Sequence, residues 1–352
     1  MSKQRPPRKA LSATPSRKRQ HIELTLTRDV RFKQKTTGLE RLEFVSNALP
    51  EVNLSDIDTS TSFLGQTIGL PFLVSCMTGG YAEALGINKR LAEVCEEMRI
   101  PMGVGSQRQA LEDSTYRRTF GVVREVAPTV PIIGNIGAAE VARMKSSEAA
   151  KRLIDLVRAD AFAVHLNPLQ ELLQPEGSTN FDGVLKGITL LVEGLPVPVI
   201  VKEIGAGISA SVARQLLDAG VRYIDIAGAG GTSWAGVETL RSKEREFASQ
   251  FWDWGIPTAT ALAEVSALRS EASPFTLIAS GGIATGVEAA KCIALGADLV
   301  GSARPVLEAL HTRKQRGVRE FLELWGKTLR GVMFLTGSRT LRDLQKAPLV
   351  RD

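Results

Sequence analysis

From residue 71 onward the sequence repeats one pattern: a short apolar run ending in glycine or a polar residue, then a segment whose apolar residues have helical spacing. The apolar runs occupy 71–77, 101–105, 131–135, 161–167, 198–203, 222–227, 275–280 and 298–302, and the helical segments 82–98, 114–126, 146–158, 182–193, 209–219, 257–269, 286–295 and 318–336. Alternating strands and helices predict a parallel sheet, and eight such units over roughly 250 residues predict an α/β fold, the (β/α)8 TIM barrel. A doubly wound sheet is the alternative, but the GxGxxG motif that usually follows its first strand is missing.

The segments outside the repeat predict additions to the barrel rather than a second domain. Residues 22–66 show no clear helical period and predict an N-terminal extension with short strands. A polar tail follows the last helical segment. Because no linker interrupts the chain, we expect one domain over 17–352, with the extension reaching to about residue 70. Residues 1–16, rich in basic residues and proline, predict a disordered arm.

The net charge of +6 comes from the N-terminus of the chain. Residues 1–20 contain seven Lys or Arg and no acidic residue, so subtracting them leaves −1 for the remainder. Because no aromatic residues are interleaved with these charges, we expect no nucleic-acid partner. No apolar run has the length of a membrane span, and no signal-peptide core is present. Three cysteines without a CxxC motif suit a reducing environment, so we expect a cytoplasmic protein without a membrane partner.

Functional groups of such barrels collect at the C-terminal ends of the strands. Every predicted strand here delivers glycine or a polar residue to that rim, which a purely structural barrel would not need. The groups after the first three strands are Met77, Thr78, Gly79, Ser106, Gln107, Arg108 and Asn135. Those after the later strands are His165, Asn167, Gln170, Glu171, Lys202, Thr232, Gly281, Gly282, Ser302 and Ala303.

The ends of the last two strands predict a phosphate site. Ser280-Gly281-Gly282 is followed one unit later by Gly301-Ser302-Ala303. Glycines let backbone N–H groups approach a phosphate, and the following helix adds its N-terminal dipole. The alternative is that both segments are simply tight turns between a strand and a helix.

The segment 161–171, AFAVHLNPLQE, combines a predicted strand with a polar cluster. Period-two alternation puts its large apolar residues on one face and small or polar residues on the other. His165, Asn167, Gln170 and Glu171 then lie at one strand end. A single carboxylate suits Mg²⁺ bound together with substrate phosphates, so Glu171 is the candidate metal ligand. The alternative for Glu171 is a charge at a helix start or on the surface.

Two cationic residues at strand ends also have two possible roles each. Lys202 closes the very apolar run VPVIVK, and a buried ammonium needs an anionic partner. That partner is either a reduced, anionic flavin or a carboxylate such as Glu203 or Asp225. Arg108 either clamps a phosphate or pairs with Glu112 one helical turn later.

The motifs at these strand ends resemble those of type 2 isopentenyl-diphosphate isomerases. The matching residues are RK-x-x-H at Arg17, Lys18 and His21, MTGG at 77–80, GSQR at 105–108, GNIG at 134–137, HLNPLQE at 165–171, VKE at 201–203, GAGGTSW at 228–234 and SGGI at 280–283. The match runs in order from about residue 17 to about residue 340. HLNPLQE and GGTSW are specific, whereas SGGI occurs in many phosphate-binding barrels.

The resemblance implies a reaction, cofactors and site residues. Members of that family are FMN-dependent barrels that interconvert isopentenyl and dimethylallyl diphosphate with reduced FMN and Mg²⁺, NADPH usually supplying the reduction; a homo-oligomer, tetramer or octamer, is expected. The implied FMN contacts are Met77, Thr78, Gly79, Ser106, Asn135, Lys202, Thr232, Gly281, Gly282, Ser302 and Ala303. The implied substrate contacts are Arg17, Lys18, His21, Ser106, Gln107, Arg108, Asn167 and Gln170. Gln170, His165 and Lys202 are the implied catalytic residues, and Glu171 is the implied Mg²⁺ ligand.

One local departure from the family motif stands near the N-terminus. Arg19 and Gln20 occupy positions that often carry acidic residues in RK-x-x-H, which makes the start of the chain more basic. We expect this departure to leave diphosphate binding in place.

Three other functions fit the sequence less well. A hydroxy-acid oxidase places its catalytic histidine after the sixth strand, where this chain has GAGGTSW. An inosine-monophosphate-type dehydrogenase needs a cysteine nucleophile in that loop, but Cys76, Cys95 and Cys292 lie elsewhere. A non-catalytic phosphate- or nucleic-acid-binding protein would not need His165, Gln170 and Lys202 at one rim.

Overall fold

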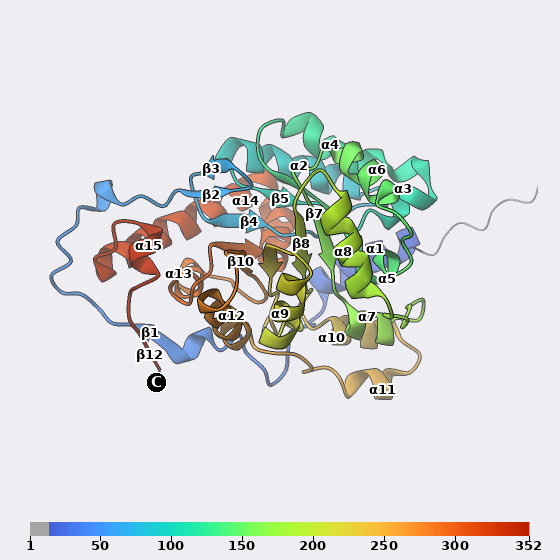
Figure 1. Ribbon diagram of the computed structural model, residues 1–352. Helices are drawn as coiled ribbons and strands as arrows, with labels where there is room; N and C mark the ends of the chain where they lie inside the picture. The colour runs from blue at the N-terminus through green and yellow to red at the C-terminus, as the bar shows by residue number, and fades with distance from the viewer. Residues whose placement is uncertain (1–13, 352) are drawn as a thin grey trace, which may run out of the picture.

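Eight parallel strands close into a barrel in the computed structural model, which describes residues 14–351 (Figure 1). Around the barrel the order of strands is β10-β11-β4-β5-β6-β7-β8-β9. Their bounds are β4 Phe72–Val74, β5 Met102–Gly103, β6 Ile132–Gly137, β7 Ala161–His165, β8 Val199–Lys202, β9 Tyr223–Asp225, β10 Thr276–Ala279 and β11 Leu299–Ser302. Each lies in or overlaps one predicted strand, so the predicted TIM barrel is confirmed.

Helices cover the outside of the barrel, as Figure 1 shows. They are α2 Ala84–Met98, α4 Arg118–Val126, α6 Glu148–Val157, α8 Val184–Gly194, α9 Ala210–Asp218, α12 Thr258–Ala267, α13 Gly286–Ala294 and α14 Arg304–Thr336. The start predicted for the last helix, residue 318, is wrong. Helical structure already begins at Arg304, and Lys314, with φ of 55°, breaks it into two parts. Residues 311–316, HTRKQR, are polar, so the apolar helical period that begins at Val318 does not extend back to the first part.

Shorter helices occupy the loops at the C-terminal ends of the strands. These are α3 Arg108–Glu112, α5 Ala138–Val141, α7 Pro168–Leu173, α10 Trp234–Arg241 and α11 Arg245–Ser249. They give the loops around the rim a fixed backbone, and therefore fix the direction of the side chains that leave it. The short helix α15, Leu341–Leu344, follows α14.

The core has two layers separated by the barrel wall. In β7, Phe162 and Val164 pack outward against the helices, whereas Ala161 and Ala163 join the barrel interior. The alternation predicted for this strand is thereby confirmed. The interior also takes in Phe63 and Ile68 of the hairpin formed by β2 Thr61–Phe63 and β3 Gln66–Ile68. The hairpin therefore contributes its apolar residues to the interior of the barrel.

The N-terminal extension begins with a helix that the sequence analysis did not predict. Helix α1, Thr14–Thr27, includes residues expected to lack helical structure and starts three residues before the expected boundary at Arg17. Its apolar residues form only a weak stripe. The helix is attached to the barrel by the polar contacts described below. Residues 1–13, most of the predicted basic arm, lie outside the described residues.

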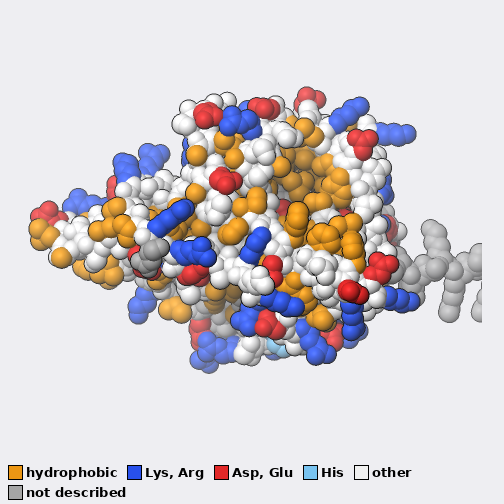
Figure 2. Space-filling view, turned by 90° about the horizontal axis from the view of Figure 1, so that it is seen from below, with side chains coloured by type: hydrophobic (Ala, Val, Ile, Leu, Met, Phe, Trp, Pro, Cys, Tyr) orange, Lys and Arg blue, Asp and Glu red, His pale blue; other side chains and the backbone are white. Residues whose placement is uncertain are grey.

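The extension is joined to the other end of the chain. Strand β1, Leu42–Phe44, pairs antiparallel with β12, Leu349–Arg351. The short 3-10 helices Leu39–Arg41 and Leu54–Asp56 flank β1 in the chain. Within residues 14–351, no helix combines the length and apolarity needed to cross a membrane. Charged side chains of both signs are interspersed with apolar side chains over the face in Figure 2.

Candidate active site

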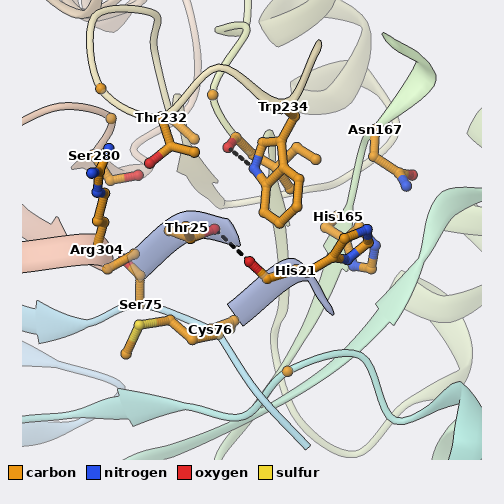
Figure 3. A pocket seen from close by; sticks show the side chains of 18 of the residues that line it. His21, Thr25, Ser75, Cys76, His165, Asn167, Thr232, Trp234, Ser280 and Arg304 are labelled. Atoms are coloured by element: carbon orange, nitrogen blue, oxygen red, sulfur yellow. Dashed lines mark hydrogen bonds between the residues drawn. The ribbon is translucent and has the colours of Figure 1, made fainter. Parts of the chain in front are cut away.

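A cavity of about 500 Å³ opens at the C-terminal ends of the strands. This volume is within the range of small-molecule and cofactor sites. Loops after all eight strands and helix α1 line it. Figure 3 shows part of this wall, with labelled side chains from α1 and from the ends of β4, β7 and β10. Of the predicted site residues, those on its wall are Arg17, Lys18, His21, Met77, Thr78, Ser106, Arg108, Asn135, His165, Asn167, Gln170, Glu171, Lys202, Thr232, Gly281, Gly282, Ser302 and Ala303.

Two predicted site residues do not line the cavity. Gln107 is fully buried, and its amide donates to the carbonyl of Leu153 at 2.9 Å and accepts from the Asn135 N–H at 2.9 Å. The predicted substrate contact at Gln107 is therefore wrong, since this side chain joins neighbouring elements below the cavity. Gly79 is a packing position, because a Cβ there would lie 2.0 Å from the Phe120 ring.

His165 is held in one orientation at the end of β7. Its Nδ1 lies 2.8 Å from Oδ1 of Asn135, and the Asn135 amide donates its own N–H to the Val104 carbonyl at 3.2 Å. The acceptor at Asn135 therefore requires the proton on Nδ1, which leaves the Nε2 lone pair free. Burial, reinforced by the charge of Lys202, lowers the pKa of His165 to about 3. The imidazole is neutral at physiological pH.

Lys202, at the end of β8, has the carboxylate partner that was one of the two interpretations from the sequence, and the flavin contact stays a prediction. It lines the cavity, and its Nζ lies 3.8 Å from Oδ2 of Asp225 and donates to the Glu203 carbonyl. Burial raises the pKa of Asp225, opposed by the nearby ammonium, and Ser280 Oγ donates to Asp225 at 2.6 Å. The ammonium therefore has a fixed carboxylate behind it while it stays at the cavity wall.

Cys76 also lines the cavity, beside Lys202. Burial raises the pKa of its thiol to about 11 despite that positive charge. The thiolate is the nucleophilic form of cysteine, so Cys76 is not an activated nucleophile.

Helix α1 joins the cavity wall through Lys18. Its Nζ donates to the carbonyls of Gly79 at 2.9 Å and Ser106 at 2.5 Å, and it lies 5.3 Å from the centre of the Phe120 ring. Burial, with a smaller effect from Arg17, lowers the pKa of Lys18 to about 7. The predicted substrate residue is thus also the residue that fastens α1 to the loops after β4 and β5.

A second contact of α1 involves a residue that the sequence analysis missed. Glu238 of α10 is fully buried, with Oε1 lying 2.8 Å from Nε2 of His21 and accepting from Gln170 Nε2 at 3.5 Å. Arg241 Nη1 donates to the other carboxylate oxygen at 2.5 Å. Helical spacing could have signalled Glu238, because it stands four residues after Trp234, whose ring lies 5.2 Å from that of His21.

Glu171 of α7 faces the cavity within a group of amides. Its carboxylate accepts from Asn167 Nδ2 at 2.9 Å and from the Ser178 N–H at 2.7 Å, and Asn167 also donates to Gln170 Oε1 at 3.2 Å. Asn167 Oδ1 is buried without a partner. Across residues 14–351, no group of three or more His, Cys, Asp or Glu is placed to hold a metal ion. A cation here would need ligands from its substrate and from water.

Arg108 pairs with Glu112, which was the alternative to phosphate binding, and its side chain also lines the cavity. Its Nε donates to Glu112 at 2.7 Å and its Nη1 lies 2.8 Å from Oε1 of Glu140. Glu140 was not predicted as a site residue; burial raises its pKa, although Arg108 opposes the shift. The neighbourhood of Arg108 is therefore already partly neutralised.

The residues near β10 and β11 suit a phosphorylated flavin. Gly281 and Gly282 have φ of +100° and +76°, and a Cβ on Gly281 would lie 2.1 Å from the Gly228 carbonyl oxygen. Only glycine fits that loop. The hydroxyls of Ser75 and Ser302 line the same side of the cavity and are buried without hydrogen-bond partners. Such orphaned groups are costly unless a ligand supplies the missing partner.

The chain matches a class of flavin enzymes over most of its length. Residues 10–123 and 143–351 match the family of FMN-dependent dehydrogenases. Two structures of mandelate oxidase, one with benzaldehyde and one with (S)-mandelic acid, superpose on this chain with a TM-score of 0.66 at 19% sequence identity. The match to the first covers 96% of this chain and 98% of the mandelate oxidase chain. The match to the second covers 97% and 98%. At that identity the similarity shows the fold. Fold and site thus define an FMN-dependent barrel.

Curated relatives of higher identity show which family within this class the chain belongs to. An isopentenyl-diphosphate delta-isomerase of Pelodictyon phaeoclathratiforme is 51% identical over 97% of this chain and 98% of its own. One from Methanothermobacter thermautotrophicus is 45% identical over 95% of this chain and 92% of its own. The chain belongs to the isopentenyl-diphosphate delta-isomerase family within the FMN-dependent barrels, which confirms the resemblance seen in its motifs.

Proposed function

We propose that this protein interconverts isopentenyl and dimethylallyl diphosphate at a reduced FMN. The observation that carries the proposal is the contact between Gln170, on the cavity wall, and the buried Glu238, which also contacts His21. Moving a double bond requires one carbon to gain a proton and another to lose one. An amide backed by a carboxylate and an imidazole gives the site a path for that proton.

Cationic residues at one end of the cavity suit a diphosphate. Arg17, Lys18 and Arg108 line it together, and the pKa of Lys18 responds to both arginines. We propose that Arg17 and Arg108 bind the diphosphate, with His21 and Ser106 at the edge of that subsite. Glu171 would hold Mg²⁺ together with diphosphate oxygens and water, which agrees with the finding that residues 14–351 contain no group of three or more His, Cys, Asp or Glu placed to hold a metal ion.

Reduced FMN supplies electron density beside the cationic transition state and a nitrogen that can carry a proton. Lys202 would balance the negative charge of the reduced ring, while Asp225 limits how much positive charge the ammonium presents. Neutral His165, with Nε2 unprotonated, would accept a hydrogen bond and orient the substrate. Thr78, Asn135 and Thr232 would bind the ring or the ribityl chain.

The remaining features of the proposal concern the setting of the enzyme. We propose NADPH as the reductant, a cytoplasmic location and a homo-oligomer of four or eight chains. Residues 17–352 would form the functional unit. The exposed side chains of Leu172, Phe247 and Trp254 are compatible with a contact between chains.

The test begins with the purified protein, which should be yellow. Reduced FMN, Mg²⁺ and isopentenyl diphosphate should yield dimethylallyl diphosphate under anaerobic conditions, followed by NMR. The rival function, oxidation of a 2-hydroxy acid, would instead reduce the flavin when mandelate or lactate is added. Flavin reduction by such an acid without isomerase activity would overturn the proposal.

A further inference from the structure

Glu140 is an acidic residue on the cavity wall that the proposed function leaves without a role. It lies in α5, directly after β6, and its side chain is 20% exposed. Its Oε1 lies 2.8 Å from Nη1 of Arg108. A Cβ on Gly137 would lie 2.5 Å from Glu140 Oε2, so the glycine at the end of β6 leaves the room that this carboxylate occupies. The acid is therefore fitted into the end of the cavity where the diphosphate is proposed to bind.

Arg108 is held between two carboxylates. Its Nε donates to Glu112 Oε1 at 2.7 Å, while its Nη1 faces Glu140. Of the two acids, Glu140 lines the cavity. A phosphate oxygen that approaches Arg108 from the cavity therefore meets the Glu140 carboxylate at the same guanidinium, and two anions placed side by side repel each other.

Charges of both signs interact at this end of the cavity. The residues concerned are Arg17, Lys18, Arg108, Glu112, Glu140 and Glu171. Burial lowers the pKa of Lys18 to about 7, so this ammonium is only partly charged near neutral pH. Burial raises the pKa of Glu140, Arg108 opposes the shift, and Glu171 adds to it. Because Arg108 is paired twice and Lys18 is partly neutral, the positive charge here falls short of the several negative charges of a diphosphate.

The groups next to Glu140 are acceptors as well. His165 Nε2 is the unprotonated nitrogen of its ring, and a Cβ on Gly137 would lie 3.2 Å from it. Asn167 Oδ1, on the same wall, is buried without a hydrogen-bond partner in the described part of the chain. Ionised phosphate oxygens also accept hydrogen bonds and donate none. The missing positive charge therefore has to arrive with the diphosphate, as a divalent cation that takes oxygen ligands.

We infer that Glu140 makes the site selective for the complex of a diphosphate with a divalent cation over the free diphosphate. Its carboxylate occupies Nη1 of Arg108 and repels an anion that arrives alone, whereas a cation bound near Glu171 compensates for that repulsion. This inference rests on the proposed function, because it needs the diphosphate to bind beside Arg108. Glu140 is a positioning residue, since it acts through Arg108 and not on the reacting carbons.

The experiment measures the affinity of the full-length, FMN-loaded protein for inorganic pyrophosphate by calorimetry, once with Mg²⁺ and once with EDTA. The wild type should bind at least about tenfold more tightly with Mg²⁺. In EDTA, Glu140→Gln should bind pyrophosphate about tenfold more tightly than the wild type does, with a change of less than about threefold in Mg²⁺. Glu112→Gln is the matched control, because it unpairs the same guanidinium away from the cavity wall; its ratio of the two affinities should match that of the wild type. In an Arg108→Gln background, Glu140→Gln should have no further effect on the ratio.

Thermal unfolding of each variant separates binding from folding. A wild-type ratio in folded Glu140→Gln would overturn the inference and leave the proposed function standing, as would an equal fall of the ratio in Glu112→Gln or an effect that persists without Arg108. If Glu140→Gln does not fold, Glu140→Ala, which removes the charge without leaving an amide on the wall, decides the matter by the same ratio. A wild type that binds pyrophosphate neither with Mg²⁺ nor with EDTA would overturn the diphosphate site of the proposed function, and the inference with it.

Discussion

Nδ1 of His165, at the end of β7, lies 2.8 Å from Oδ1 of Asn135 on the neighbouring strand β6. This contact fixes the neutral tautomer in which Nε2 carries no proton. A histidine on the cavity wall is thus prevented from acting as a general acid at physiological pH. The arrangement agrees with a site in which His165 orients a ligand rather than delivering a proton.

The buried neutral state of His165 predicts an acid-dependent loss of stability. Its folded-state pKa, about 3, lies below the ordinary value of 6.5. Between these values the unfolded chain binds a proton that the folded protein does not, so stability falls as pH decreases. Relative to His165→Gln, the wild type should lose up to about 1.4 kcal/mol per pH unit below pH 6. Urea unfolding at pH 7, 6, 5 and 4 measures the difference; parallel pH curves for the two proteins would contradict it.

Glu171→Gln is expected to weaken Mg²⁺ binding, and so to raise the Mg²⁺ requirement, while flavin stays bound. The substitution keeps the shape that accepts from Asn167 but removes the negative charge. The Mg²⁺ concentration for half-maximal activity and the apparent substrate KM should rise at least about tenfold. Glu112→Gln is the control, because that carboxylate also lies near the substrate end but pairs with Arg108. An unchanged Mg²⁺ requirement in Glu171→Gln would remove the residue from this role.

The N-terminus should divide into a dispensable part and an essential part. Deleting residues 1–13 should leave turnover intact, because the deletion stops before α1. Lys18→Met should raise the substrate KM and loosen α1, since two carbonyls lose their shared donor. Proteolysis of the helix and steady-state kinetics are the two measurements. Loss of activity in the folded deletion variant would place the functional boundary nearer to residue 1.

Two glycine substitutions distinguish an effect on FMN binding, in the loop after β10, from an effect on protein stability, in helix α14. Gly281→Ala should abolish tight FMN binding and cost about 2 kcal/mol or more, because φ is +100° and the new Cβ would meet the Gly228 carbonyl. Gly331→Ala, within α14 and with no neighbour within 4 Å, should leave FMN binding unchanged and stabilise the protein by about 0.5–1 kcal/mol. Flavin titration and thermal unfolding test both. Equal effects of the two substitutions would contradict the assignment of the loop.

The sequence predicted the barrel and most of the site because both depend on local patterns. Strand ends follow from alternation, and the closure of eight parallel strands brings those ends to one rim whatever their distance in the chain. The interaction partners of individual side chains were harder to predict from the sequence. That Arg108 pairs with Glu140, or His21 with Glu238 more than 200 residues away, depends on how loops pack. Gln107 shows the opposite error, since its place in a site motif hid a buried structural amide.

The flavin is expected to act without net electron transfer. The proposed reaction has no net redox change, and Cys76 is not an activated nucleophile. Reduced FMN should therefore be required but not consumed, so that one photoreduction without NADPH supports many turnovers under anaerobic conditions. NMR follows the product while absorbance follows the flavin. Stoichiometric oxidation of the flavin during turnover, or full activity with oxidised FMN, would refute the mechanism.

Lys202 offers the matched substitution for this experiment. Lys202→Ala should lower activity by removing the counter-charge of the reduced ring, and it also leaves the buried Asp225 carboxylate unpaired. The double variant Lys202→Met with Asp225→Asn removes both charges and should recover folding stability without recovering activity. If the double variant turned over as fast as the wild type, the ammonium would have no part in the reaction beyond holding Asp225.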